Sequence, residues 1–325
     1  MEVSLWMWGT TLAFVLILVL VDLFVHRKPA ETTLKEAAWA TLIWTVIGLA
    51  FSGVVLAEGG GTATGQYVAG YLLERTLSID NVFVFVLILG YFAVPSALEH
   101  RALLFGVLAA LVLRAVFIFV GAAALDHLSW MTYVFGAILL VTAAKLMRGG
   151  EDEVDPARNV ALRLLRRVVP VTDRYHDHKL LVRVGGRRAA TPLLAVLLVL
   201  GTTDLVFAVD SIPAIFAVTR EPYLVFTSNA FAVLGLRSMS VLLARVVDRF
   251  EYLKHALAIV LAFVGLHMIV EDWVHLSIWA SLAIIGTILG GGIGISLFAT
   301  RGQRGHEVAG SPAASSTPTD PSKEH

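Results

Sequence analysis

Four acidic side chains lie inside apolar stretches of this chain, in two similarly spaced pairs. The first pair is Glu74 and Asp80, in LLERTLSIDNVFVFVLILGYF, and the second is Asp204 and Asp210, in LLVLGTTDLVFAVDSIPAIFAV. In each pair five residues separate the acids, and a small polar residue follows the aspartate. A carboxylate at membrane depth costs roughly 2.5 kcal/mol or more, so it is rarely there without a role. The pattern predicts a cation site built twice by one repeated unit.

Further oxygen donors accompany these acids. The predicted metal ligands are Asp80, Asp210, Glu74, Asp204, Asn81, Ser211 and Asn229. Carboxylate, amide and hydroxyl oxygens suit hard or borderline cations such as Mn²⁺, Mg²⁺ or Ca²⁺. The chain has no cysteine, which excludes thiolate ligands and disulfides, and no cofactor is predicted besides a transported cation. Clustered acids also shift one another's pKa values, which allows proton exchange as a metal leaves.

Helix geometry limits how each acidic pair can act. Residues six apart on a straight helix point about 120° away from each other, whereas residues three, four or seven apart share a face. Glu74 and Asp80 therefore need either a broken helix or partners from the other repeat. Pro213, three residues after Asp210, favours a break because proline frees a backbone carbonyl. We expect Asp80 and Asp210 to meet near a pseudo-two-fold axis.

Basic residues in the apolar segments offer a second interpretation of the acids. Glu74 can instead pair with the neighbouring Arg75, and the other acids with Arg114 or Arg237. Arg114 and Arg237 lie within predicted helices, which favours supporting counter-charges over anion ligands. His267, in VGLHMIV, is a candidate metal ligand or proton relay, and the alternative is a hydrogen-bonded packing histidine.

The elements that must position these residues are membrane helices. Of the 325 residues, 57% are hydrophobic and 15% are charged. The mean hydropathy of +0.79 is far above that of a soluble domain. A run of about 20 apolar residues spans a bilayer. The predicted fold class is all-α, a polytopic transmembrane helical bundle with about nine helices, at 3–25, 37–57, 70–92, 102–124, 130–147, 192–218, 223–244, 255–272 and 276–299. The net charge of zero gives no argument for nucleic acid as a partner.

Basic and non-basic connections alternate along the chain. Residues 26–36, 148–191 and 245–254 are basic, residues 58–66 contain no Lys or Arg, and Arg220 is the main exception. The positive-inside rule predicts an outside N-terminus and a cytoplasmic C-terminus in the cytoplasmic membrane. The predicted segments are an N-terminal helix and loop (1–36), a first half (37–147), a basic cytoplasmic loop (148–191), a second repeat (192–272), a last helix (273–300) and a disordered tail (301–325).

The two acidic segments begin an internal repeat. Residues 70–147 match 192–272, and an offset of 130 aligns both acids of one pair with those of the other. A competing offset of 124 aligns Asp80 with Asp204 and matches more apolar residues. Three helices per copy is an odd number, so the copies lie antiparallel in the membrane. Inverted repeats around a midplane site are a common transporter plan.

Several stretches resemble one family of membrane proteins. GYLLERTLSIDNVFVFVLIL, HRALLFGVLAALVLRAVFIFVGAAAL, TDLVFAVDSIPAIFAVT and TSNAFAVLGLRS are similar to the TerC (tellurium resistance protein C) family, from about Leu34 to Met268. The resemblance implies an inner-membrane protein of the LysE-like transporter superfamily. Its members are linked to manganese efflux, with tellurite resistance as the historical label. Relatives often have an acid where this chain has Gly201, and a lysine where it has His267.

The leading functional hypothesis is a secondary transporter that exports Mn²⁺ or a related divalent cation, with protons or Na⁺ as the counter-ion. A G-x-x-x-x-G-K-[ST] loop for ATP is absent from the sequence. The alternative is a non-transporting membrane anchor of a stress-response complex, with a cytoplasmic protein partner at 148–191. An aspartyl protease is disfavoured because GTTD replaces G-x-G-D, and no enzyme activity is predicted. A tellurite carrier would need a cationic binding centre because tellurite is an oxyanion, whereas the paired motifs are acidic.

Overall fold

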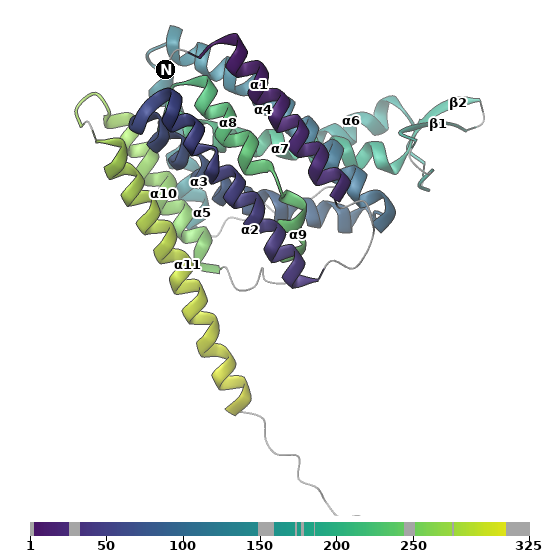
Figure 1. Ribbon diagram of the computed structural model, residues 1–325. Helices are drawn as coiled ribbons and strands as arrows, with labels where there is room; N and C mark the ends of the chain where they lie inside the picture. Colours follow the sequence, from purple (N-terminus) through teal and green to yellow (C-terminus); the bar gives the residue numbers. More distant parts are fainter. Residues whose placement is uncertain are drawn as a thin grey trace, which may run out of the picture.

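The computed structural model describes residues 3–25, 33–148, 159–172, 174–176, 179–184, 186–243, 251–274 and 276–309. At further positions, including Asp80 and Arg237, it describes the backbone but not the side chain. The described chain folds mainly into helices that pack side by side, and α11 extends well beyond the others (Figure 1).

The elements follow one another in this order. They are α1 (Leu5–Val25), α2 (Leu34–Ala50), α3 (Ser52–Tyr91), α4 (Ser96–His127), α5 (Met131–Met147), α6 (Val160–Val168), β1 (Leu181–Val184), β2 (Arg187–Ala190), α7 (Pro192–Phe216), α8 (Pro222–Val233), α9 (Leu236–Leu243), α10 (Glu251–Val270) and α11 (Ile278–Ala309).

The described helices include several that can cross a bilayer. By length and composition, α1, α4, α7 and α11 each contain such a span, and α2 with α3 forms a fifth candidate that is bent by 41°. The apolar helices α5 and α10 are shorter. The chain is therefore a multi-pass helical membrane protein with four or five spans by this measure, and nine separate spans stay a prediction.

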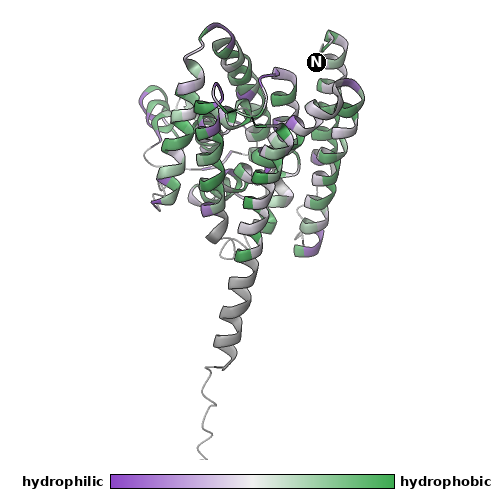
Figure 2. Cartoon of the chain, turned by 90° about the vertical axis from the view of Figure 1, so that its left-hand side faces the viewer, coloured by the Kyte–Doolittle hydropathy of each residue, from purple (hydrophilic) through white to green (hydrophobic). Residues whose placement is uncertain are grey.

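The outside of the bundle is apolar along much of its height (Figure 2). On α4, the side chains of Val112, Val116, Phe119 and Val120 are all exposed in the middle of the helix. Their spacing of three and four residues places them on one helix face. A surface of this kind is a liability in water and is the surface expected against lipid.

The predicted connection at 58–66 is helical, with a kink at Gly60. This glycine has a φ of 72° inside α3, a conformation that glycine adopts readily because it has no Cβ. Beyond the kink, Tyr67 donates a hydrogen bond to the carbonyl of Gly48 (2.7 Å), and Tyr71 donates one to the carbonyl of Thr45 (3.3 Å). Successive turns of α3 therefore run back along α2.

The predicted helix 223–244 is divided into α8 and α9. The break lies at Gly235, which has a φ of 77°. Arg75 caps the end of α8, because its Nη1 donates hydrogen bonds to the carbonyls of Ala232 (2.8 Å) and Leu234 (2.9 Å). These carbonyls would otherwise be left unpaired at the helix end. Arg75 therefore pairs with α8 rather than with the neighbouring Glu74.

The predicted break at Pro213 is wrong. Helix α7 continues through Pro213 and ends at Phe216. Proline removes one backbone hydrogen bond, but the helix continues for three residues beyond it. The second acidic helix is therefore continuous, and the discontinuity lies in the next one along the chain.

Replacement of Gly235 by alanine tests the break between α8 and α9. A Cβ at Gly235 would lie 2.5 Å from the indole of Trp44, and overpacking of this kind costs about 1–3 kcal/mol. The left-handed backbone adds roughly 1–2 kcal/mol for a residue with a Cβ. We expect Gly235→Ala to lower the thermal unfolding midpoint by several degrees. The matched control is Gly290→Ala in α11, where a Cβ meets nothing within 4 Å; an equal loss in both variants would contradict the prediction.

The basic segment 148–191 contains a short helix and a β-hairpin. Asn159 caps α6, because its Oδ1 accepts hydrogen bonds from the amides of Ala161 (3.0 Å) and Leu162 (3.2 Å). Strands β1 and β2 pair antiparallel. Tyr175 attaches the segment to the bundle by donating to the carbonyl of Phe92 (2.8 Å), and burial raises the pKa of its hydroxyl. The hairpin projects from one side of the bundle (Figure 1), whereas α6 packs on α7 through the buried Leu162.

The C-terminal helix is longer than predicted. Helix α11 continues past residue 300 to Ala309, into the segment that the sequence predicts to be a disordered tail. Residues 310–325 lie outside the described part of the chain.

Candidate cation site

Helices α3 and α7 form the interface on which several predicted ligands meet. At one end, Thr219, just beyond α7, donates through Oγ1 to Gln66 Oε1 (3.2 Å). One turn further along α3, a Cβ at Gly70 would lie 3.1 Å from the side chain of Ile215. Residue numbers therefore rise along α3 as they fall along α7, and the two helices run antiparallel.

A spacing of seven residues defines the polar face of each helix. Glu74 and Asn81 lie seven apart on α3, and Asp204 and Ser211 lie seven apart on α7, so each pair shares a helix face. All four residues are buried. Continuing the antiparallel register places Glu74 level with Ser211, and Asn81 level with Asp204. Each acid thus lies opposite the small polar residue of the other helix.

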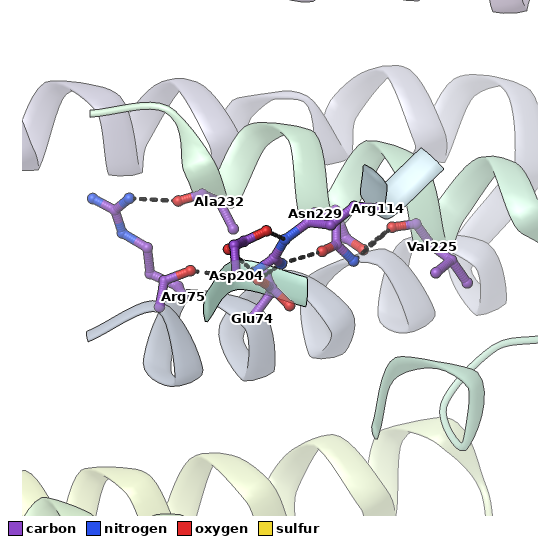
Figure 3. A network of polar contacts seen from close by, with 9 residues as sticks. Glu74, Arg75, Arg114, Asp204, Val225, Asn229 and Ala232 are labelled. Carbon is purple, nitrogen blue, oxygen red and sulfur yellow. Dashed lines mark hydrogen bonds and ion pairs between the residues drawn. The ribbon is translucent and has the colours of Figure 1, made fainter. Parts of the chain in front are cut away.

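Arg114 from α4 lies between the two acids (Figure 3). Its Nη1 makes an ion pair with Glu74 Oε1, and its Nη2 lies 3.3 Å from Asp204 Oδ1. Nη1 also donates to Asn229 Oδ1 (2.6 Å) on α8. The side chains of Arg114 and Glu74 are 1% and 0% exposed. Because charges so deeply buried require partners, these groups hold one another in place.

Asn81 completes the partners of this guanidinium. In the amide orientation that satisfies its neighbours, its Oδ1 accepts a hydrogen bond from Arg114 Nη2 (3.1 Å), and its Nδ2 donates to the carbonyl of Leu77 (3.3 Å). Glu74, Asn81, Asp204 and Asn229, four of the predicted metal ligands, therefore meet around Arg114, and their role as metal ligands stays a prediction.

Binding capacity remains within this group. Two carboxylates against one guanidinium leave a net negative charge of about one. Within the described residues, Glu74 Oε2 and Ser211 Oγ are buried and have no hydrogen-bond partner, and buried polar atoms are normally paired. The site can therefore accept a further positive charge or a hydrogen-bond donor.

Asp210 faces a different part of the bundle. Its Oδ1 accepts a hydrogen bond from Thr142 Oγ1 (2.7 Å) on α5, as expected for a residue about 120° around α7 from Asp204. The side chains of Asp80 and Arg237 lie outside the described residues. The predicted meeting of Asp80 with Asp210 therefore stays a prediction, and so does the role of Arg237.

His267 lies on α10, and its ring stacks on Phe263 with the centroids 6.2 Å apart. Among the described side chains, it makes no hydrogen bond with the Arg114 group. Nor do the described residues contain a group of three or more His, Asp or Glu side chains that could hold a metal. A cation at the Arg114 site would therefore need amide and hydroxyl oxygens, or Asp80, beside the two acids.

Two features of the site escaped the sequence reasoning. The first is the bridging position of Arg114, which the sequence suggested only as a supporting charge. The second is the contact of Arg75 with α8, across 157 residues of chain. The sequence contained one signal for the shared polar face, which is the spacing of seven residues between Glu74 and Asn81. The same spacing recurs between Asp204 and Ser211.

Comparison with known proteins identifies the family. The integral membrane protein TerC family matches residues 59–304, which include every residue of the Arg114 site. The chain belongs to the TerC family. Its carboxylates, arginine and asparagines therefore form the buried polar centre of a TerC protein.

Relatives share most of the length of this TerC chain. An uncharacterized membrane protein of Myxococcus xanthus is 43% identical over 91% of the chain and 93% of its own length. Alx of Escherichia coli, whose name proposes a membrane-bound redox modulator, is 42% identical over 87% of the chain and 91% of its own length. The thylakoid membrane protein TERC of Arabidopsis thaliana is 39% identical over 82% of the chain and 70% of its own length. The search of solved structures found no match.

Proposed function

We propose that this TerC protein is a secondary transporter that exports a divalent cation, with Mn²⁺ as the best candidate, across the cytoplasmic membrane. The observation that carries the proposal is the pair of buried carboxylates, Glu74 and Asp204, which meet at Arg114 from two antiparallel helices. Ionised groups within a membrane are rare, and they mark ion pathways when they face the interior of a bundle.

The arrangement of α3 and α7 supports an inverted repeat. The offset of 130 relates Glu74 to Asp204 and Asn81 to Ser211. In the antiparallel register, each acid lies opposite the small polar residue of the other helix, which is what a two-fold axis in the membrane plane would produce. We therefore favour this offset over 124, and propose nine spans in which α5 and α10 also cross the membrane. The basic loops then place the N-terminus outside.

A discontinuous helix beside the site supports transport. Helix α8 is buried from Tyr223 to Val233 and ends at the break before Gly235. It contributes Asn229 to the Arg114 group, and Arg75 holds its last carbonyls. Secondary transporters commonly bind their substrates beside broken helices of this kind.

Arg114 acts in this proposal as an internal counter-ion. Without a cation, the guanidinium neutralises one of the two negative charges and holds both acids. A divalent cation competes for the same oxygens, and Arg114 then loses some of its contacts with Glu74 and Asp204. When the cation leaves, Arg114 returns, so the acids are never buried without a positive partner.

The chemistry of the donors narrows the cargo. Carboxylate, amide and hydroxyl oxygens suit Mn²⁺, Mg²⁺ and Ca²⁺. Protons or Na⁺ are the proposed counter-ions, and a net negative centre is unsuited to tellurite. A redox role like the one in the name of Alx could not use thiols of this chain, because its sequence has no cysteine.

A membrane anchor remains the second candidate, because the hairpin projects from the bundle (Figure 1) and α6 has an exposed apolar face. On α6, Val160, Leu164 and Val168 are all exposed and share one helix face. A cytoplasmic protein partner at 148–191 would dock there. In that case, the segment would be essential and the buried acids would not.

Flux measurements separate the two candidates. Purified full-length protein in proteoliposomes should take up Mn²⁺ down its gradient in a saturable way, and an opposing pH or Na⁺ gradient should change the rate. Mn²⁺, Mg²⁺, Ca²⁺ and Zn²⁺ are compared in turn. Uptake equal to that of protein-free vesicles for every cation and gradient would reject the transporter and favour the anchor.

A further inference from the structure

A cavity of about 440 Å³ lies between α3, the end of α7, α10 and the start of α11. Apolar side chains line much of it, but His267 from α10, Glu271 just beyond the end of α10, and Gln66 from α3 also contribute. The cavity is large enough for a hydrated cation, since one water occupies about 30 Å³ of liquid.

Exposed aromatic residues mark the level of this cavity in the membrane. Trp279 lines the cavity at the start of α11, and Trp273 lies in the preceding turn. Both are exposed, as is Trp130, which directly precedes α5. Tryptophan gathers at the boundary between lipid and water. The cavity therefore lies at one membrane surface, which is the outer surface in the proposed orientation.

The imidazole of His267 lines the cavity and has a ring nitrogen that is unpaired in the described part of the chain. Its Nε2 is buried and has no hydrogen-bond partner within the described residues. Glu271 follows four residues later, in the turn that directly continues α10, and both side chains line the cavity. This spacing lets a nitrogen and a carboxylate reach the same ion.

Arg220 is the charged group that faces Glu271 from outside α10. Its Nη2 lies 3.0 Å from Glu271 Oε2, and the two side chains are 53% and 42% exposed. Exposed ion pairs of this kind contribute little free energy, so a cation can displace Arg220. The pair therefore keeps the mouth of the cavity neutral until a cation arrives.

We propose that His267 Nε2 and the carboxylate of Glu271 bind one divalent transition-metal cation as it leaves the protein, with water as the remaining ligands. This exit site rests on the proposed export function, and it is a second binding site for the same transported cation. An imidazole nitrogen suits Zn²⁺ best, and the carboxylate and water oxygens are the ligands that suit Mn²⁺. Two protein ligands give weak binding, which suits release.

Electron spin-echo envelope modulation of Mn²⁺ tests the imidazole directly, because it detects a ¹⁴N nucleus bound to the metal. The full-length protein is loaded with Mn²⁺ in lipid nanodiscs. We expect ¹⁴N coupling in the wild type, its loss in His267→Gln, and its retention in His255→Gln, a control on the same helix. The coupling should also persist in Asp204→Asn, which alters only the inner site.

Affinity for Mn²⁺ gives a second measurement on the same samples. Loss of a ligand in His267→Gln or Glu271→Gln should weaken binding at this site by about tenfold or more, since even outer-shell changes have effects of that size. Arg220→Gln should strengthen it, because the variant frees Glu271. Equal affinities in wild type, His267→Gln and Glu271→Gln would overturn the exit site.

Flux measured on the same proteins distinguishes failure of the exit site from failure of the transporter. If Mn²⁺ is transported but the wild type has no ¹⁴N coupling, or the coupling persists in His267→Gln, the exit site is wrong and transport stands. If the coupling depends on His267 but no cation is transported, the cavity is a metal site and the export function is wrong.

Discussion

Replacement of Arg114 by methionine should reduce the stability of the folded protein by about 3–5 kcal/mol, which is the typical cost of breaking a buried ion pair from one side. Methionine fills a similar volume but leaves Glu74 and Asp204 without their shared positive partner. Both acids are buried, so water cannot replace the guanidinium. The measurement is the thermal unfolding midpoint in detergent, followed by fluorescence-detected size-exclusion chromatography.

Two further variants identify the cause of that loss. Arg220→Met removes an arginine from a half-exposed ion pair with Glu271, and surface pairs contribute only about 0–1 kcal/mol. A triple variant, Arg114→Met with Glu74→Gln and Asp204→Asn, should recover much of the stability because it removes the unpaired charges. If Arg114→Met unfolded at the wild-type temperature, the three side chains would not form the buried ionic group described above.

The sequence already predicted part of this site, for a physical reason. Glu74, Asp204 and Arg114 lie in stretches that are otherwise apolar, and ionised side chains there must find one another. The need for ionic partners could therefore be predicted without coordinates, but the sequence paired Glu74 with Arg75 and did not reveal that Arg114 bridges both acids. What the pattern could not decide was the spacing, since the motifs contain polar residues both six and seven positions apart. A helix surrounded by lipid and other helices is apolar on most sides, so hydrophobic periodicity does not reveal which face meets a partner.

The breaks in the helices were harder to predict. Pro213 was the obvious candidate, but α7 continues through it to Phe216. Gly235 lies in an apolar stretch, and its left-handed backbone depends on its close approach to Trp44 and on the capping of α8 by Arg75. Both partners are more than 150 residues away in the chain. Contacts at such separation come from tertiary packing, which local sequence patterns do not record.

Neutralisation of either acid at the Arg114 site should strongly reduce transport. In Glu74→Gln or Asp204→Asn, one carboxylate faces one guanidinium, so the net negative charge of the site disappears while the shape of the side chain is kept. The protein should fold, because Arg114 retains an ionic partner. A dication then meets a neutral site, and we expect Mn²⁺ flux in proteoliposomes to fall at least about tenfold, since 1.4 kcal/mol of lost attraction suffices for that factor.

The matched control for these variants is Asp272→Asn. Asp272 is an exposed acid beyond α10 that accepts a hydrogen bond from Tyr133 (3.0 Å), so its neutralisation should leave flux unchanged. Asp210→Asn and Asp80→Asn extend the test. If both abolish flux while Glu74→Gln and Asp204→Asn do not, the cation passes by Asp210 and Thr142, and the Arg114 group is a structural ion pair. Loss in all four variants would instead indicate one continuous pathway, in which α7 presents Asp204 to one side of the bundle and Asp210 to α5.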